Sequence, residues 1–351
     1  MHKLRILLRN ESVMWTDAFI IKGGMDEVVA LLYRIIAVEW REEHEDNLLH
    51  ETLLCLKALC TTSLALRRLT QVRDRLFQAL LGMVFDEERK GPSEYSTRGV
   101  IVSLLFAHLS EALHGGASDT EIVEGECPKD RAKVILGYLR DPTPEGEKAP
   151  LGFIAEMHVS RPWKVWGKEV VNVTKEVFWI FLHHGNVITL PEDTDNRVAA
   201  DEEIETDYAK KHFPRPRPPH PAAPYTGGVE WEATQYLALH LDLLNGLIAC
   251  AGSREERNEL RKELRESGWE KWMGGTVRTC KEKFYGAVHE GLRCWVRAAD
   301  TDGWEVKEVR EGVQRELKSP AKKVTGRGAA APKLDVNVGS GGSGSLDEEW
   351  L

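Results

Sequence analysis

The stretch LLHETLLCLKAL, from Leu48 to Leu59, decides the fold class. Six of its twelve residues are leucine, and Leu49, Leu53 and Leu56 recur at helical spacing along one face. Other apolar side chains cover much of the remaining circumference: Leu48, Leu54, Cys55 and Ala58. A helix that is apolar nearly all round is covered on several sides. The stretch therefore predicts a helix enclosed by other helices.

Further helices are expected on both sides of this stretch. Apolar residues recur at helical spacing in Met25–Val38, Arg73–Phe85 and Ser96–Leu113, and the segment Trp15–Gly24 ends in a Gly-Gly stop. Helices of this length with short connections favour a right-handed α-solenoid over a four-helix bundle. Strand content near zero is expected.

Helical spacing returns after Val229 and continues for about five turns. The apolar positions that carry it are Ala233, Leu237, Leu241, Leu244 and Ile248. Ser253 and Glu256 then form a capping box, and Gly268 supplies the stop of an outer helix. A last long helix is expected over Thr276–Ala299.

The middle of the chain is irregular. Asp141–Pro150 is a turn-rich loop, and Val170–His184 is expected to be a helix, with a strand as the alternative. Glu192–Pro224 is acidic and then proline-rich, so a mobile and dispensable insertion is expected. Its prolines leave open a polyproline II ligand for a Src-homology-3-type domain. After about Leu317 the composition is that of a flexible tail, which ends in GSGGSGSLDEEWL.

Composition excludes several classes of protein. The net charge of −9 over 351 residues argues against general nucleic-acid binding. No apolar run is long enough to span a membrane, and the opening residues lack the features of a signal peptide. The six cysteines form no CxxC pair, so free thiols in a reducing cytoplasm are expected.

No motif for catalysis stands out. The sequence has no GxSxG, no phosphate-binding glycine loop and no HExxH around His183 and His184. Those histidines are expected to be ordinary core or surface residues, and the eleven tryptophans are expected to be mainly packing anchors. The prediction is a protein that is not an enzyme, with no catalytic residue, no metal and no cofactor.

Three segments together resemble the N-terminal regulatory region of fungal diaphanous-type formins. LRILLRNESVMWTDAFIIKGGMDEVVALL resembles the first armadillo repeats, and AVEWREEHEDNLLHETLLCLKALCTT resembles the next. GGVEWEATQYLALHLDLLNGLIACAGSREERNELRKELRESGWEKWMGG resembles the closing repeats of the formin homology 3 region. The resemblance covers Leu4–Glu311 and is poor over His114–Pro224. It implies an all-α, armadillo-like α-solenoid with a long disordered insertion and a flexible C-terminal tail.

The resemblance also divides the chain. Residues 1–113 correspond to the first repeats, with the C-terminal part of the GTPase-binding region and the inhibitory groove. Residues 114–227 form an irregular helical segment with the insertion 191–224. Residues 228–317 are the closing repeats, and residues 318–351 are a linker or tail.

The function that the resemblance implies is a switch. In the family, a Rho-type small GTPase displaces a C-terminal inhibitory helix of the same formin from a groove and so releases actin assembly. The module also helps to place the protein on the cytoskeleton at growth sites and septa, in cell polarity and cytokinesis. These implications predict helix-in-groove recognition in competition with a second ligand. A homodimer is left open.

The groove-lining positions that match the family are Ile6 and Asn10 in the first repeat, with Thr61 and Thr62 after the CLKAL helix. The animal pattern has an asparagine pair where this chain has threonines, and an amide offers more hydrogen bonds than a hydroxyl. The chain starts at the first repeat, so the residues that contact the GTPase are not assigned. A generic armadillo-like adaptor that binds peptides without GTPase control is the alternative, followed by an enzyme with an unrecognised site.

Overall fold

Most segments with apolar residues at helical spacing are helices in the structure. The computed structural model describes residues 1–86, 88, 91–114, 126–142, 161–177, 179–190, 205–217 and 227–312. The helices within these ranges are α1 (His2–Asn10), α2 (Val13–Ile21), α3 (Gly24–Ile36), α4 (Glu43–Leu59), α5 (Ser63–Val84), α6 (Tyr95–His114), α7 (Pro128–Leu139), α9 (Lys164–Glu176), α10 (Glu205–His212), α11 (Gly228–Cys250), α12 (Arg254–Glu266), α13 (Trp269–Gly275), a 3-10 helix (Val277–Thr279), α14 (Gly286–Thr301) and α15 (Lys307–Glu311).

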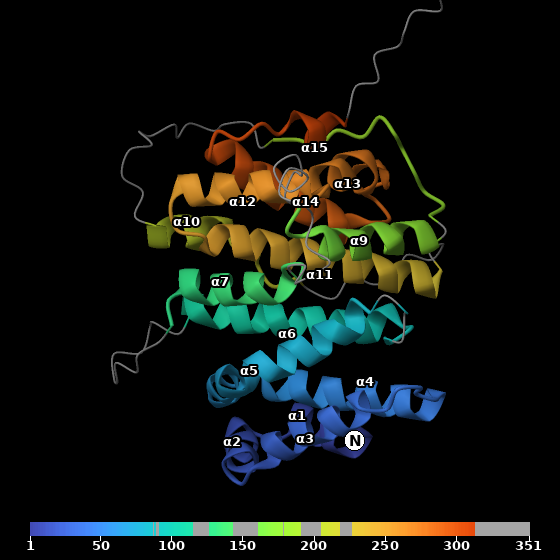
Figure 1. Ribbon diagram of the computed structural model, residues 1–351, viewed down its shortest axis with the longest axis vertical. Helices are drawn as coiled ribbons and strands as arrows, with labels where there is room; N and C mark the ends of the chain where they lie inside the picture. The colour runs from blue at the N-terminus through green and yellow to red at the C-terminus, as the bar shows by residue number, and fades with distance from the viewer. Residues whose placement is uncertain are drawn as a thin grey trace, which may run out of the picture. The chain divides into compact units, whose positions relative to one another are not determined.

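Four helices, α4, α6, α11 and α14, form a central ladder. Each packs on the next, α4 on α6, α6 on α11 and α11 on α14, as the stacked layers in Figure 1 show. The most enclosed of them is α11, in which 17 of 23 residues are buried. The other helices cover the ladder from its sides, and Met1–Gln314 form one compact unit. The predicted all-α solenoid is confirmed.

The opening stretch lies in α4 and is enclosed as expected. Leu49, Leu53, Leu56 and Leu59 are fully buried, and α1, α3 and α6 all pack against this helix. Leu48 keeps 37% of its surface exposed. The helix is therefore covered on three sides and leaves one narrow strip open.

The start of α12 confirms the predicted capping box. The Ser253 hydroxyl accepts the Glu256 N–H at 3.3 Å, and the Glu256 carboxylate accepts the Ser253 N–H at 3.2 Å. Gly268, at φ +95°, ends the turn in the left-handed region that glycine adopts without strain.

The helix predicted for Val170–His184 is wrong beyond Glu176. After α9 the chain is extended, and the His183 N–H donates to the Thr279 carbonyl at 2.6 Å. The Lys281 N–H donates to the Phe181 carbonyl at 2.9 Å, and an isolated antiparallel bridge joins Leu182 to Cys280. The backbone groups of residues 181–183 thus form hydrogen bonds with a segment about 100 residues away in the sequence. The spacing of apolar residues within the run cannot predict such a pairing.

The same pairing corrects the helix predicted for Thr276–Ala299. Only Val277–Thr279 makes a 3-10 turn, residues around Cys280 are extended, and α14 begins at Gly286. Backbone groups of Thr279 and Lys281 form hydrogen bonds with the segment around Leu182, so they are not available for the hydrogen bonds of a continuous helix.

The insertion predicted as mobile over Glu192–Pro224 is also corrected in part. Residues 205–217 are ordered, with α10 packed on α11 and α14. Within α10, the buried Tyr208 donates its hydroxyl hydrogen to Asp302 at 2.6 Å. Aromatic and basic side chains therefore anchor a segment whose composition is that of a loop. Residues 191–204, 218–226, most of the Asp141–Pro150 loop and the tail after Leu317 lie outside the described residues.

Candidate protein-interaction surface

The four predicted groove residues lie on two parts of the N-terminal layers. The Met1 carbonyl is 3.7 Å from the Cys55 thiol, and Arg5 bonds Glu51 at 2.8 Å, so α1 runs antiparallel to α4. Ile6 and Asn10 are therefore beside the first half of α4. Thr61 and Thr62 follow its last turn, about 20 Å farther along at 1.5 Å per residue.

The two threonines have local hydrogen bonds. The exposed Thr61 donates its hydroxyl hydrogen to the Ala58 carbonyl at 2.8 Å. Thr62 is buried, donates to the Leu59 carbonyl at 3.2 Å and accepts the Ala65 N–H at 3.3 Å as the N-cap of α5. The hydroxyl of Thr62 is thus committed to the helix junction, while Ile6, at 43% exposure, is available on the surface.

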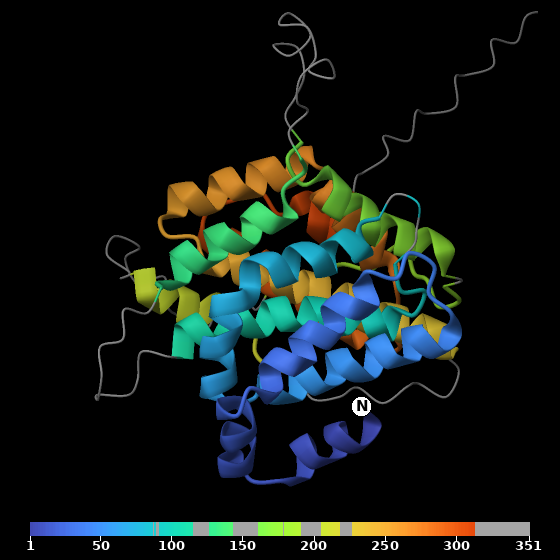
Figure 2. The same cartoon turned by 60° about the horizontal axis from the view of Figure 1, so that its bottom comes forward.

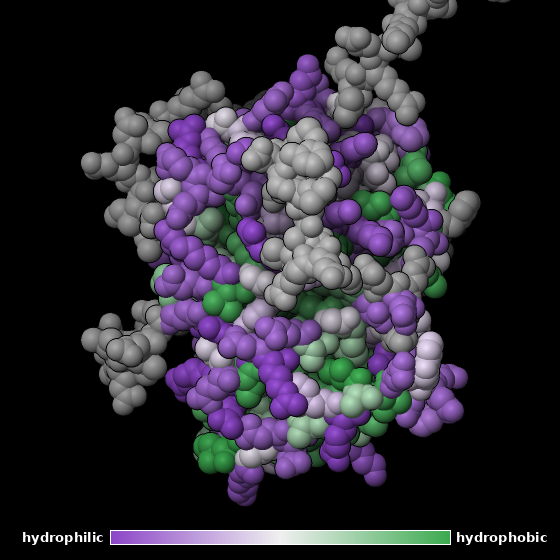
Figure 3. All heavy atoms as spheres, in the orientation of Figure 1, coloured by the Kyte–Doolittle hydropathy of each residue, from purple (hydrophilic) through white to green (hydrophobic). Residues whose placement is uncertain are grey.

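A larger apolar surface lies on the N-terminal layers. Seven exposed large apolar side chains come from α1, α2, the α3–α4 connection and the start of α4: Ile6, Leu7, Val13, Met14, Ile21, Trp40 and Leu48. We call this set the N-terminal apolar surface. Figure 2 shows α1 and α2 on the outside of the N-terminal end, and Figure 3 shows apolar groups among charged ones over these layers.

The sequence of α2 explains why it exposes so much apolar surface. VMWTDAFII is apolar on all sides, yet only Thr16 and Ile20 are buried. Met14 and Ile21 are 82% and 77% exposed. Trp15 and Phe19, one helical turn apart, stack with ring centroids 5.7 Å apart and pack against the core, and α2 lies on α3 and α5. The exposed side chains are therefore carried by a helix that is packed on two others.

Charged residues border this surface. The first turn of α4 is acidic, with Glu43, Glu45 and Asp46, and Trp40, which is 74% exposed, precedes it in the sequence. An apolar centre with a polar rim and an aromatic residue is typical of protein–protein interfaces. The sequence analysis included Ile6 but missed the rest, although the apolar residues around the circumference of α2 were a readable signal.

Four further exposed apolar side chains lie elsewhere: Ile180, Leu182, Val187 and Val229. The Ile180 N–H donates to the Glu230 carboxylate at 3.3 Å, which places this extended segment beside the start of α11. These positions provide matched controls for substitutions on the N-terminal apolar surface.

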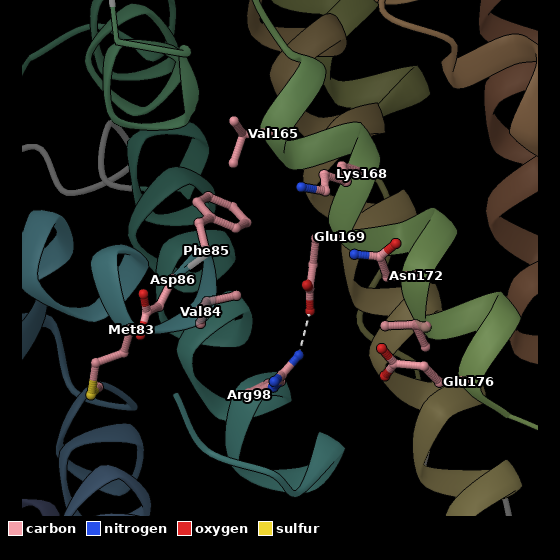
Figure 4. A pocket seen from close by; sticks show the side chains of 11 residues that line it. Met83, Val84, Phe85, Asp86, Arg98, Val165, Lys168, Glu169, Asn172 and Glu176 are labelled. Atoms are coloured by element: carbon pink, nitrogen blue, oxygen red, sulfur yellow. Dashed lines mark hydrogen bonds and ion pairs between the residues drawn. The ribbon is translucent and has the colours of Figure 1, made fainter. Parts of the chain in front are cut away.

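A cavity of about 300 Å³ lies between the end of α5, the start of α6 and one face of α9. Arg98 and Glu169 point toward each other across it and pair at 2.8 Å, as Figure 4 shows. Tyr236 also donates to Glu169, at 2.9 Å, and Tyr95 donates to Glu176 at 3.2 Å. Burial, together with the neighbouring Glu176 carboxylate, raises the pKa of Tyr95 to about 12.

Both partners bond the Oε1 atom of Glu169, and no serine, threonine, cysteine or histidine is among the described residues that line the cavity. It can hold a small polar group, and we assign no reaction to it. Its central pair joins positions 71 residues apart, so no sequence motif could have indicated it.

The other predicted residues are placed as follows. His183 bonds Asn186 at 2.9 Å in the turn of the extended segment, and the described residues contain no cluster suited to a metal ion. All six cysteines are free; four are buried, Cys294 is partly buried and Cys127 is exposed. None of the described helices is long and apolar enough to cross a membrane.

Comparison with known proteins gives one clear result. No family profile matches the sequence, and no solved structure matches it. A relative in Schizosaccharomyces pombe, the GTPase-binding protein rid1, is 32% identical over 314 residues, which are 89% of this chain and 68% of that protein. With this identity over most of both proteins, the chain belongs to the family of the GTPase-binding protein rid1.

Proposed function

We propose that this protein is a regulatory module that binds a small GTPase of the Rho type and acts by binding alone, without catalysis. The observation that carries the proposal is the identity shared with a relative named for GTPase binding over nearly the whole solenoid. The resemblance to formin regulatory regions supports the Rho type and a role at the actin cytoskeleton.

The N-terminal apolar surface is the proposed contact for the GTPase. Met14 and Ile21 project from a helix that is packed on two others, and Trp40 is a large aromatic side chain of the kind that forms binding hot spots. Apolar groups kept exposed on a folded support lose little conformational entropy when a partner covers them. This surface is therefore better suited to a tight contact than the charged faces of α12.

The test is a titration of the purified chain against Rho-type GTPases loaded with GDP or with a non-hydrolysable GTP analogue. Tighter binding of the GTP-analogue form is expected. Met14→Asp and Ile21→Asp should each weaken it by about 2 kcal/mol, or 30-fold, the scale of a hot spot. Val229→Asp, a substitution at a similarly exposed position outside the surface, should have no effect.

Two results would count against the proposal. Equal affinity for both nucleotide states would favour the generic adaptor, because such a protein has no GTPase control. A loss of binding in Val229→Asp equal to that in Met14→Asp would mean that the contact lies elsewhere. Thermal melts of all variants separate loss of binding from loss of folding.

A second part of the proposal concerns an inhibitory amphipathic helix, for which the strip of α1 and α4 around Ile6 and Leu48 is the proposed site. Both side chains are exposed on helices packed together. Ile6→Asp should weaken binding of a formin C-terminal inhibitory segment by about 2–4 kcal/mol. Equal binding by wild type and variant, or no binding by wild type, would remove this part and leave the GTPase proposal intact.

A further inference from the structure

Residues 208–217 run along the central ladder in the direction opposite to α14. The Tyr208 hydroxyl lies 3.0 Å from the Ala298 carbonyl near the end of α14, and the Cys294 thiol donates to the His212 carbonyl at 3.4 Å. Arg217 donates to the Ala287 carbonyl at the start of the same helix. The segment therefore lies lengthwise on α14. It is also beside α11, next to which Figure 1 shows α10.

The first anchor of the terminal part of this segment is Phe213. Its ring stacks on Phe106 of α6 with centroids 5.2 Å apart. At Gly246, in the interior of α11, an added Cβ would lie 3.0 Å from the Phe213 ring and 3.1 Å from Leu109. Glycine weakens a helix interior, so its presence here has a local reason: it leaves room for the aromatic ring.

The second anchor is Arg217, four residues later. Its guanidinium donates to the Asp242 carboxylate of α11 and lies 3.6 Å from Glu290 of α14. Asp242 is buried, and burial raises its pKa to about 7 in spite of the Arg217 charge. A carboxylate in such a place needs a cationic partner.

A second glycine faces this anchor. At Gly291, in the interior of α14, an added Cβ would lie 2.8 Å from Leu241 and 3.3 Å from the Arg217 guanidinium. The ladder thus offers two places of defined chemistry, one apolar and one acidic, and each lies beside a helical glycine. The apolar place holds Phe213 and the acidic place holds Arg217, so the two places accept an aromatic residue and an arginine four positions later.

Residues 213–217 are held by these side chains and not by backbone pairing. Pro214 and Pro216 have no N–H to donate; Pro214 is buried, and Arg215 and Pro216 are exposed. Between residues 208–217 and the other described elements there is no backbone–backbone hydrogen bond. Tyr208, by contrast, is buried and bonded to Asp302. The segment is fixed at its Tyr208 end, and its Arg217 end is held by the side chains of Phe213, the buried Pro214 and Arg217.

We propose that the face of α6, α11 and α14 is a receptor for an extended peptide that carries an aromatic residue and, four positions later, an arginine. Residues Phe213–Arg217 occupy this receptor from within the chain, and a partner polypeptide with the same pair of side chains replaces them. The occupied site shows the chemistry of the ligand directly. This site is separate from the N-terminal apolar surface, and its test needs no GTPase.

The experiment uses a labelled synthetic peptide of residues 208–217, YAKKHFPRPR, and the full chain. In wild type the internal segment competes at an effective concentration in the millimolar range. The variant with Phe213→Ala and Arg217→Ala lacks both anchoring side chains and leaves their two places open to the peptide. If it binds the peptide with a Kd of about 10 µM, wild type should bind about 100-fold more weakly.

Two controls define the site. Adding Asp242→Asn to the double variant, or changing the last arginine of the peptide to alanine, should weaken binding at least about 10-fold, because the charged pair is lost. Arg215→Ala, at an exposed position in the same segment, should behave as wild type.

Three results would overturn the proposal. One is a double variant that does not bind the peptide, and another is equal binding by wild type and variant. The third is loss of helical circular dichroism in both the double variant and Arg217→Ala alone, since residues 213–217 would then be a required part of the core.

Discussion

The two ends of the solenoid differ in how their charged and apolar side chains are buried. At the C-terminal end, Asp302 is 1% exposed and receives hydrogen bonds from Arg257 at 2.6 Å and from Arg261 at 2.6 Å. Glu270, also 1% exposed, accepts from Arg265 at 2.7 Å and from Trp304 at 2.8 Å. Buried charges with several partners therefore join α12, α13 and the end of α14.

The N-terminal end has no comparable buried network among its described residues. Its ion pairs, Arg68 with Asp26 and Arg5 with Glu51, are partly exposed, and the N-terminal apolar surface faces solvent. A repeat protein usually covers its terminal helices with a polar face to stay soluble. The contrast suggests that one end is specialised for stability and the other for association.

The largest expected effect breaks the C-terminal network. Asp302→Ala leaves Arg257 and Arg261 as uncompensated buried charges, which should cost about 3–5 kcal/mol of the free energy of unfolding. Urea denaturation measures the loss. Glu259→Ala, which removes the exposed pair with Lys262, is the matched control and should cost less than about 1 kcal/mol. Equal losses would mean that the network is not what closes this end.

The pH dependence of the free energy of unfolding tests the contribution of the Asp302 carboxylate separately. Burial acts to raise the pKa of Asp302, but hydrogen bonds from Arg257 and the charge of Arg261 outweigh it, so the pKa is lowered. An acid with a folded pKa below its unfolded value of about 4 stabilises the protein above that pH and loses this contribution as the pH falls further. Asp302→Asn should therefore flatten the stability curve below pH 4, and an unchanged curve would contradict this assignment.

The next effect compares buried and exposed leucines within one N-terminal helix. Leu53→Ala creates a cavity at a fully buried position of α4 and should cost about 2–5 kcal/mol. Leu48→Ala, at 37% exposure, should cost clearly less than Leu53→Ala. Thermal or urea unfolding of both variants measures the difference. Similar costs would show that the open strip of α4 is covered.

A smaller effect distinguishes the two threonines after α4. Thr62→Ala removes the N-cap of α5 and should cost about 1 kcal/mol, whereas Thr61→Ala should stay within about 0.5 kcal/mol. Thr62→Ser keeps the capping oxygen and should restore most of the loss. If Thr62→Ala does not change stability but weakens binding of an inhibitory helix, Thr62 belongs to the groove and not to the cap.

The smallest effect is expected at the N-terminal apolar surface itself. The double substitution Met14→Asp and Ile21→Asp changes two side chains that are 82% and 77% exposed, so unfolding should change by no more than about 0.5 kcal/mol. Its effect should be on GTPase binding. A loss of more than about 1 kcal/mol in stability would show that α2 is packed more tightly than its exposure suggests.

Local pattern was enough to predict most of the helices. The spacing in α3, α4, α6 and α11 and the capping box of α12 depend on neighbours a few residues apart, and these predictions agree with the structure. The glycine and capping signals also marked helix ends correctly, at Ser253 and at Gly268.

The failures share a different cause, because each depends on partners far apart in the sequence. The pairing of Leu182 with Cys280 turned an expected helix into extended chain, and Tyr208 is ordered by Asp302, 94 residues away. The candidate surface was only partly predictable, since exposure of Met14 depends on how α2 sits on α3 and α5. Single-sequence spacing carries no information on such contacts.

The placement of the tryptophans gives the protein two separate optical reporters. Trp166 and Trp269 are fully enclosed, with ring centroids 4.5 Å apart at an interplanar angle of 62°, whereas Trp40 is 74% exposed beside the proposed contact surface. Close, angled indoles produce coupled near-ultraviolet dichroism that vanishes when the core opens. An indole in water emits at longer wavelength, and a partner that covers it shifts that emission to the blue. Near-ultraviolet dichroism can therefore report folding through the interior, and the difference in emission between wild type and Trp40→Phe can report docking at the N-terminal end.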